Sequence, residues 1–158
     1  MIQDALLIIH IVCGAVGLVV AALALFAPKR RGWHTRLGRI YLLAVAGIVS
    51  TTLGLFLYAP TELLGLGIIG IATGICAGLG FWMVRARPML RGGTWFTWHL
   101  NLMSSSYISF VTAFLVQMTD GHLLAWLLPT IIGSPLIALR TARAVTGSRS
   151  SVRKQPSY

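Results

Sequence analysis

Four histidines are the side chains in this sequence best suited to hold a metal ion or a haem iron: His10, His34, His99 and His122. An imidazole nitrogen is a common metal ligand, and helical bundles hold cofactors between facing helices. The membrane threading given below places His10 and His122 near the outer surface, and His34 and His99 near the inner one. One alternative is therefore a pair of haem b groups that carries electrons across a bilayer.

Two sulfur-containing side chains extend this set of ligands. Cys13 follows His10 by three residues and Met103 follows His99 by four, so each pair can share one face of a helix. Such pairs would suit copper or another thiophilic metal ion. The competing interpretation is structural: His34 and His122 lie at the membrane surfaces, and the other two histidines donate hydrogen bonds to a neighbouring helix. The residues alone leave both interpretations open.

Several function classes are disfavoured by what the sequence lacks. With the fifth span ended at residue 139, no Asp, Glu, Lys or Arg lies within a predicted span, which argues against a proton pump or a carboxylate-driven transporter. A serine hydrolase would need a buried acid to orient its base. The chain also contains no Gly-rich phosphate loop, no CxxC and no HExxH motif. We therefore expect a protein other than an enzyme.

The elements that must position these residues are membrane helices. The chain has 158 residues, of which 56% are hydrophobic and only 10% charged, whereas a soluble domain carries about 25% charged residues. A bilayer core needs about 20 apolar residues per helix. Five stretches meet this requirement, so we predict an all-α bundle that forms a single domain over residues 1–145. The predicted spans are 5–27, 40–59, 63–84, 95–118 and 122–139, the last continuing to about residue 143.

The charged residues predict how the chain is threaded. All thirteen Lys and Arg residues lie in 29–39, 85–91 and 140–154, and the three acids, Asp4, Glu62 and Asp120, lie in the alternate loops. Because basic loops stay in the cytoplasm, the N-terminus is expected outside and the C-terminus inside a bacterial inner membrane. The net charge of +10 then reflects topology and lipid rather than nucleic acid. Residues 146–158 are expected to form a mobile basic tail.

Small and polar residues indicate how the helices meet. Small residues let helix backbones approach closely in lipid, which predicts packing at Gly14, Gly17, Gly70, Gly74 and Gly78. The fourth span is the most polar and should be central. A polar cavity is predicted at Asn101, Ser105, Ser106, Ser109 and Gln117. Tyr41 is expected among the aromatic side chains at the membrane surface.

The order of these motifs resembles a family of small bacterial multi-span membrane proteins known only as a domain of unknown function. The first half of the resemblance consists of His10, Gly14, Gly17, His34, Gly38, Arg39 and Tyr41. The second half consists of His99, Met103, Ser106, Tyr107, Thr112, Ala113, Phe114, Trp126, Pro129, Thr130, Gly133 and Pro135. It covers most of residues 7–139, although the basic loop reads HTR where the family often has His-Arg. The resemblance implies a helical bundle and draws attention to His10, His34 and His99, but it implies no reaction.

Three functions remain open at this point. The protein is a structural or accessory subunit, or a small binding protein, with membrane partner subunits or copies of itself. It is alternatively a histidine-liganded haem or metal redox protein. It is alternatively a carrier or anionic-lipid-binding protein whose head-group cations are Arg36, Arg39, Arg85 and Arg87, each contributing about 1 kcal/mol near an anionic surface.

Overall fold

The computed structural model describes residues 1–27, 32–89 and 94–152, and in these ranges it contains five helices and no strand. All five are long and apolar enough to cross a membrane, as predicted. The helices are α1 (Ile2–Phe26), α2 (Trp33–Phe56), α3 (Leu64–Ala86), α4 (Trp95–Met118) and α5 (Leu123–Val152).

Two helices extend beyond the apolar spans. α2 begins at Trp33, seven residues before the expected span, so His34, Arg36 and Arg39 belong to its first turns. α5 continues past its membrane segment, which ends at Arg143, as far as Val152. Both extensions contain charged residues. Their side chains can reach water from the helix surface, so these charges do not end the helix. The first residues of the expected tail are thus helical, and 153–158 lie outside the described residues.

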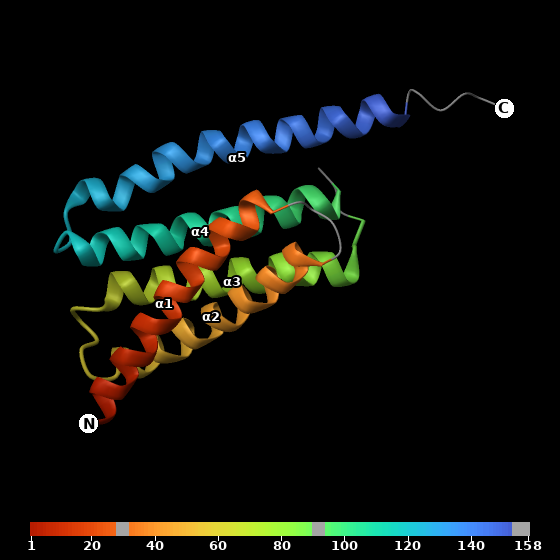
Figure 1. The fold of residues 1–158 in the computed structure, drawn as a ribbon. Helices are drawn as coiled ribbons and strands as arrows, with labels where there is room; N and C mark the ends of the chain where they lie inside the picture. Colours follow the sequence, from red (N-terminus) through yellow and green to blue (C-terminus); the bar gives the residue numbers. More distant parts are fainter. Residues whose placement is uncertain (28–31, 90–93, 153–158) are drawn as a thin grey trace.

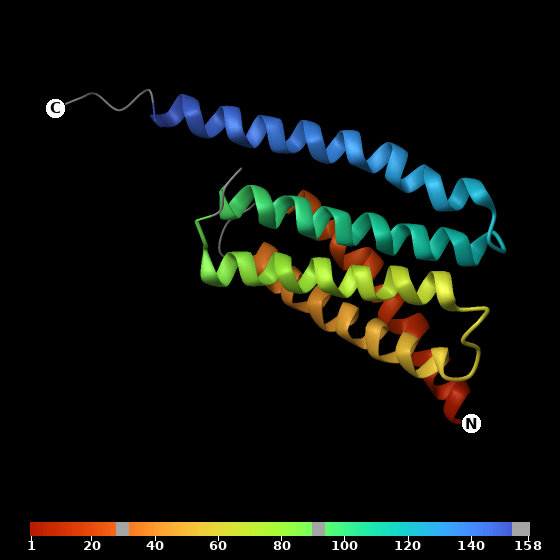
Figure 2. The same ribbon diagram turned by 180° about the vertical axis from the view of Figure 1, so that it is seen from behind.

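The first four helices form one body and the fifth lies along its edge. α1 packs on α2, α2 on α3, and α3 on α4, while a smaller contact between α1 and α4 closes the body. Within the described residues, α4 is the one helix against which the backbone of α5 packs. Figures 1 and 2 show α5 running beside α4, on the side away from α2 and α3. We call α1–α4 the four-helix body and α5 the edge helix.

The two ends of the bundle differ in charge. One end holds Asp4, Glu62 and Asp120, and we call it the acidic end. The other, here the basic end, is where α1 and α3 end and where α2 and α4 begin (Figure 1). Arg140 of α5 lies at this end, because it bonds to Leu25 in the last turn of α1. At the acidic end α4 and α5 are joined by a tight turn, in which Asp120 has φ 51° and Gly121 has φ 82°.

The core of the body surrounds Tyr41, which is 2% exposed. Tyr41 was expected among the aromatic side chains at the membrane surface, but its side chain is enclosed by the body and does not face lipid. It lies two turns from the start of α2 at Trp33, about 12 Å at 1.5 Å per residue. Its ring packs at a tilted angle on Phe110 of α4, with 6.2 Å between the ring centroids. The other buried members of this core are Ala21, Val45, Ile48 and Ala77.

Close backbone approach is required at two of the five predicted packing glycines. A Cβ atom at Gly17 would lie 2.8 Å from Cζ of Phe110, and one at Gly74 would lie 2.9 Å from Cγ2 of Val49. Both distances are shorter than ordinary van der Waals contacts. Gly14 and Gly70 meet neighbours at ordinary or slightly short distances, whereas Gly78 faces open space.

Candidate functional site

His10 links α1 to α2. Its Nδ1 lies 3.0 Å from the hydroxyl oxygen of Thr51. That hydroxyl donates its own hydrogen to the carbonyl oxygens of Gly47 and Ile48, at 2.8 and 3.0 Å. Because the hydroxyl hydrogen is used there, Nδ1 of His10 must carry the hydrogen that it shares with Thr51.

His34 and His99 make bonds of the same kind at the basic end. Nδ1 of His34 lies 3.1 Å from the carbonyl oxygen of Ala24 in α1. Nδ1 of His99 lies 2.7 Å from the carbonyl oxygen of Gly80 in α3. A carbonyl oxygen only accepts, so Nδ1 donates in both cases. Three histidines therefore join neighbouring helices of the four-helix body.

His122 has a different role at the acidic end. It is exposed, and its Nδ1 accepts a hydrogen bond of 3.3 Å from the backbone N–H of Leu124. The first N–H groups of a helix have no partner within the helix, so this bond caps α5. In the neutral ring the hydrogen then lies on Nε2.

The sulfur atoms of the predicted metal pairs pack against backbone. A Cβ at Gly47 would lie 2.6 Å from Sγ of Cys13, and one at Gly80 would lie 2.8 Å from Sδ of Met103. Across the described parts of the chain, no three His, Cys, Asp or Glu side chains come together to hold a metal ion. The haem and thiophilic-metal alternatives therefore gain no support from this arrangement.

A buried hydrogen-bonded network crosses the centre of the body. Ser106, which is 0% exposed, donates to the carbonyl oxygen of Thr73 at 3.1 Å. Its oxygen lies 2.7 Å from the hydroxyl of Tyr41. Since Ser106 has given its hydrogen to Thr73, Tyr41 is the donor of that bond. The network joins α2, α3 and α4, and its Tyr41 member was missed in the sequence.

The other four residues predicted to line the polar cavity have different surroundings. Asn101 accepts a hydrogen bond of 2.8 Å from Thr141 of α5. Ser105 and Ser109 are half-buried and Gln117 is exposed. None of the five predicted cavity residues lines the groove described next.

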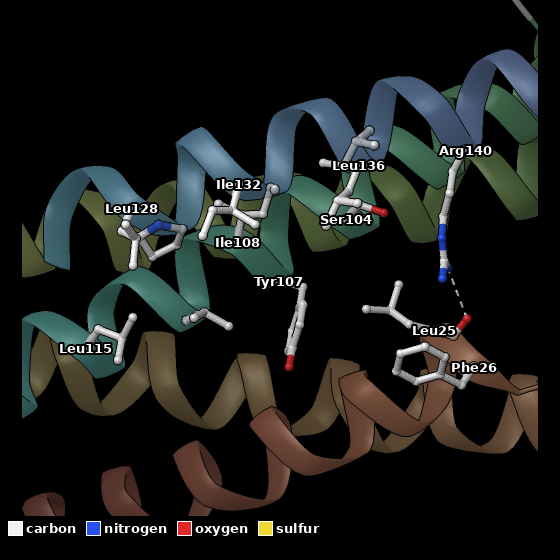
Figure 3. Close-up of a pocket in the computed structure, with 14 residues that line it drawn as sticks. Leu25, Phe26, Ser104, Tyr107, Ile108, Leu115, Leu128, Ile132, Leu136 and Arg140 are labelled. Atoms are coloured by element: carbon white, nitrogen blue, oxygen red, sulfur yellow. Dashed lines mark hydrogen bonds between the residues drawn. The ribbon is translucent and has the colours of Figure 1, made fainter. Parts of the chain in front are cut away.

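A groove of about 400 Å³ runs between α4, α5 and the end of α1. This volume lies within the range of about 300 to 1,000 Å³ that is typical of small-molecule sites. Most of its wall is apolar, and Figure 3 shows the side chains of α4 and α5 facing each other across it. Prominent lining residues are Leu25 and Phe26 of α1, Ser104, Tyr107, Ile108 and Leu115 of α4, and Leu128, Ile132, Leu136 and Arg140 of α5.

Arg140 supplies the cation of this groove, at the basic end. Its Nη1 donates to the carbonyl oxygen of Leu25 at 3.3 Å, across from α5 to α1 (Figure 3). Its guanidinium carbon lies 5.8 Å from the centroid of the Phe26 ring. Both contacts are made with the last turn of α1, where carbonyl groups lack helical partners. The groove is therefore apolar along most of its length, and Arg140 places one positive charge at its basic end.

The cations predicted to bind lipid head groups lie elsewhere on the basic end. Arg36, Arg39, Arg85 and Arg87 are exposed. The guanidinium carbon of Arg85 lies 5.2 Å from the centroid of the Phe81 ring, and that of Arg87 lies 5.2 Å from the Trp95 ring. None of the four lines the groove.

Five apolar helices and a groove within them define a multi-pass membrane protein in contact with the lipid bilayer. A family model described as "Predicted membrane protein (DUF2306)" matches residues 7–145, and the chain belongs to this family. The family is of unknown function, as the resemblance implied. No curated protein and no solved structure matches the chain.

Proposed function

We propose that this protein is a small binding protein of the bacterial cytoplasmic membrane, whose ligand is an elongated and mainly apolar molecule held in the α4–α5 groove. The observation that carries this proposal is the groove itself, with apolar walls from three helices and a cation at one end. Molecules of this kind dissolve in the bilayer and can enter sideways between helices. Binding sites between the helices of bundles commonly have this form.

The surroundings of the other candidate residues favour this function over the alternatives. His10, His34 and His99 each bond to a neighbouring helix, and Ser106 is enclosed by Tyr41 and Thr73. These polar groups hold the four-helix body together. The groove, by contrast, contains space next to a charged side chain.

The proposed topology has the N-terminus outside and the basic end in the cytoplasm, since Lys and Arg favour that side. Arg36, Arg39, Arg85 and Arg87 then face anionic lipid head groups. Single cysteines at exposed positions can test this, in a chain with Cys13 and Cys76 changed to Ser. Thr61→Cys should react with a membrane-impermeant maleimide in intact cells, and Met89→Cys only after lysis. The reverse pattern would overturn the topology.

Binding in the groove is tested by narrowing it. Ile132 lines the groove and is 54% exposed, whereas Ile131 is 64% exposed and lies outside the lining. Ile132→Trp should lower the binding of hexadecanol about tenfold, as measured by native mass spectrometry of the purified protein, because the indole fills space that the chain occupies. Ile131→Trp is the matched control and should bind as the unaltered protein does. Equal binding by both variants would contradict the proposed function.

A further inference from the structure

We propose that Arg140 is the head-group site of the groove, and that the ligand is a single-chain amphiphile with an anionic head, such as a long-chain carboxylate. This inference rests on the proposed function and names its ligand class. The groove supplies a place for the chain, and Arg140 supplies a partner for the charge.

The geometry of Arg140 suits an anion at the end of a chain. It is a lining residue, and its guanidinium is turned toward the last turn of α1 (Figure 3). A guanidinium has five N–H donors, arranged in a fork that matches a carboxylate or phosphate. The bond to Leu25 is 3.3 Å long and involves one nitrogen, so the group has donors to offer a head group.

The chain has no acidic side chain near Arg140. Its three acids are Asp4, Glu62 and Asp120, and all of them lie at the acidic end, across the membrane thickness from Arg140. Arg140 is exposed, so water can solvate its charge when the groove is empty. An anionic head group beside it would meet no competing acidic side chain, which favours an anionic over a neutral ligand.

The length of the groove suits an extended chain. From Leu128 to Arg140 the groove follows α5 for about 18 Å at 1.5 Å per residue. Among the residues that the structure describes, Arg140 is the one charged residue in the lining, which matches a ligand with one head group at the end of one chain.

The hydrogen bond from Thr141 to Asn101 supports the position of Arg140. It joins α5 to α4 one residue beyond the guanidinium, at 2.8 Å. Arg140 is thus held at the basic end of the groove. In the proposed topology, this end receives ligands from the cytoplasmic leaflet.

The test compares two probes with the same chain: palmitate, which is anionic, and hexadecanol, which is neutral. Binding of each to the full-length protein in neutral detergent is measured by native mass spectrometry. The unaltered protein should bind palmitate at least about tenfold more tightly, because hydrogen bonds to charged groups are the stronger kind. Arg140→Gln should abolish this preference and leave hexadecanol binding unchanged, while Arg140→Lys should retain part of it.

The matched control is Arg143→Gln, which removes an exposed cation that does not line the groove. It should leave the preference for palmitate intact. Equal affinity of the unaltered protein for both probes, or equal loss in the Arg140 and Arg143 variants, would overturn the head-group site. Failure of both probes to bind would instead overturn the proposed function.

Two competitors test the remaining parts of the ligand description. Millimolar inorganic phosphate should displace little palmitate, and displacement of most of it would show that a free anion is the ligand. Dioleoyl phosphatidylglycerol should compete more weakly than unlabelled palmitate. Stronger competition by this lipid would overturn the single-chain assignment.

Discussion

The four-helix body and the edge helix use polar residues in opposite ways. In the body, Tyr41, Ser106 and Thr73 satisfy one another in the core, and three histidines bond across helix pairs. Along the edge helix, Arg140 lies beside an apolar groove with no acidic side chain at its end of the bundle. Polar groups that are already paired stabilise a fold, whereas space beside a cation with donors to spare can take a ligand. We therefore place binding at the edge and stability in the body.

The largest effect is expected from a bulky side chain at a close helix contact of the body. Gly17→Leu would force its side chain into Phe110, and overpacking of this kind costs about 1–3 kcal/mol. The free energy of unfolding, measured by SDS denaturation from mixed micelles, should fall by about 3 kcal/mol. Gly78→Ala is the control, because a Cβ there meets open space, and it should change little. A stable Gly17→Leu protein would show that α1 is not packed against α4 as described.

A smaller loss is expected in the buried network. Ser106→Ala removes the acceptor of the Tyr41 hydroxyl and the donor to Thr73. Leaving a buried polar group unpaired costs about 1–3 kcal/mol, so we expect a loss near 2 kcal/mol in the same denaturation assay. Tyr41→Phe keeps the ring and should cost less. If Ser106→Ala is neutral, the network does not hold the body together.

The histidine bonds should each contribute less than the buried network. His10→Ala removes one hydrogen bond between α1 and α2, and hydrogen bonds between membrane helices contribute about 0.6 kcal/mol on average. Unfolding free energy should fall by about 1 kcal/mol once the lost packing is included. Thr51→Val removes the same bond from the other side and serves as the comparison. A large loss for His10→Ala with none for Thr51→Val would indicate a role other than joining helices.

The smallest stability effect is expected at the edge helix. Thr141→Val removes the hydrogen bond to Asn101 and should lower the unfolding free energy by about 0.6 kcal/mol or less. Palmitate binding should fall more clearly than stability does, since Arg140 is the next residue. The comparison between body and edge would fail if Thr141→Val destabilised the protein as much as Ser106→Ala does.

The number and type of the helices could be predicted from the sequence, because each span carries enough apolar residues to meet the bilayer requirement. The start of α2 could not, since hydropathy marks the apolar segment and not the end of the helix. The burial of Tyr41 could not be predicted either, because it depends on how α2 packs against Phe110 of α4.

The candidate site was predicted less well, for a related reason. Arg140 fits the charge pattern that sets topology, so the sequence offered no separate signal for it. Its importance depends on Leu25 and Phe26, more than a hundred residues away in the chain. The histidines stood out by residue type, but type alone does not say whether Nδ1 meets a protein carbonyl, as it does at His34 and His99.

The central claim is that an amphiphile occupies the edge groove, and a photolabel map tests it most directly. A palmitate analogue with a diazirine in its chain would be crosslinked to the protein in nanodiscs, and the adducts located by tandem mass spectrometry. We predict that adducts concentrate on the groove residues of α4 and α5, such as Tyr107 and Ile132, and decrease in Arg140→Gln. Adducts spread over the lipid-facing surfaces of α1, α3 and α5 alike, with no effect of Arg140→Gln, would contradict the account.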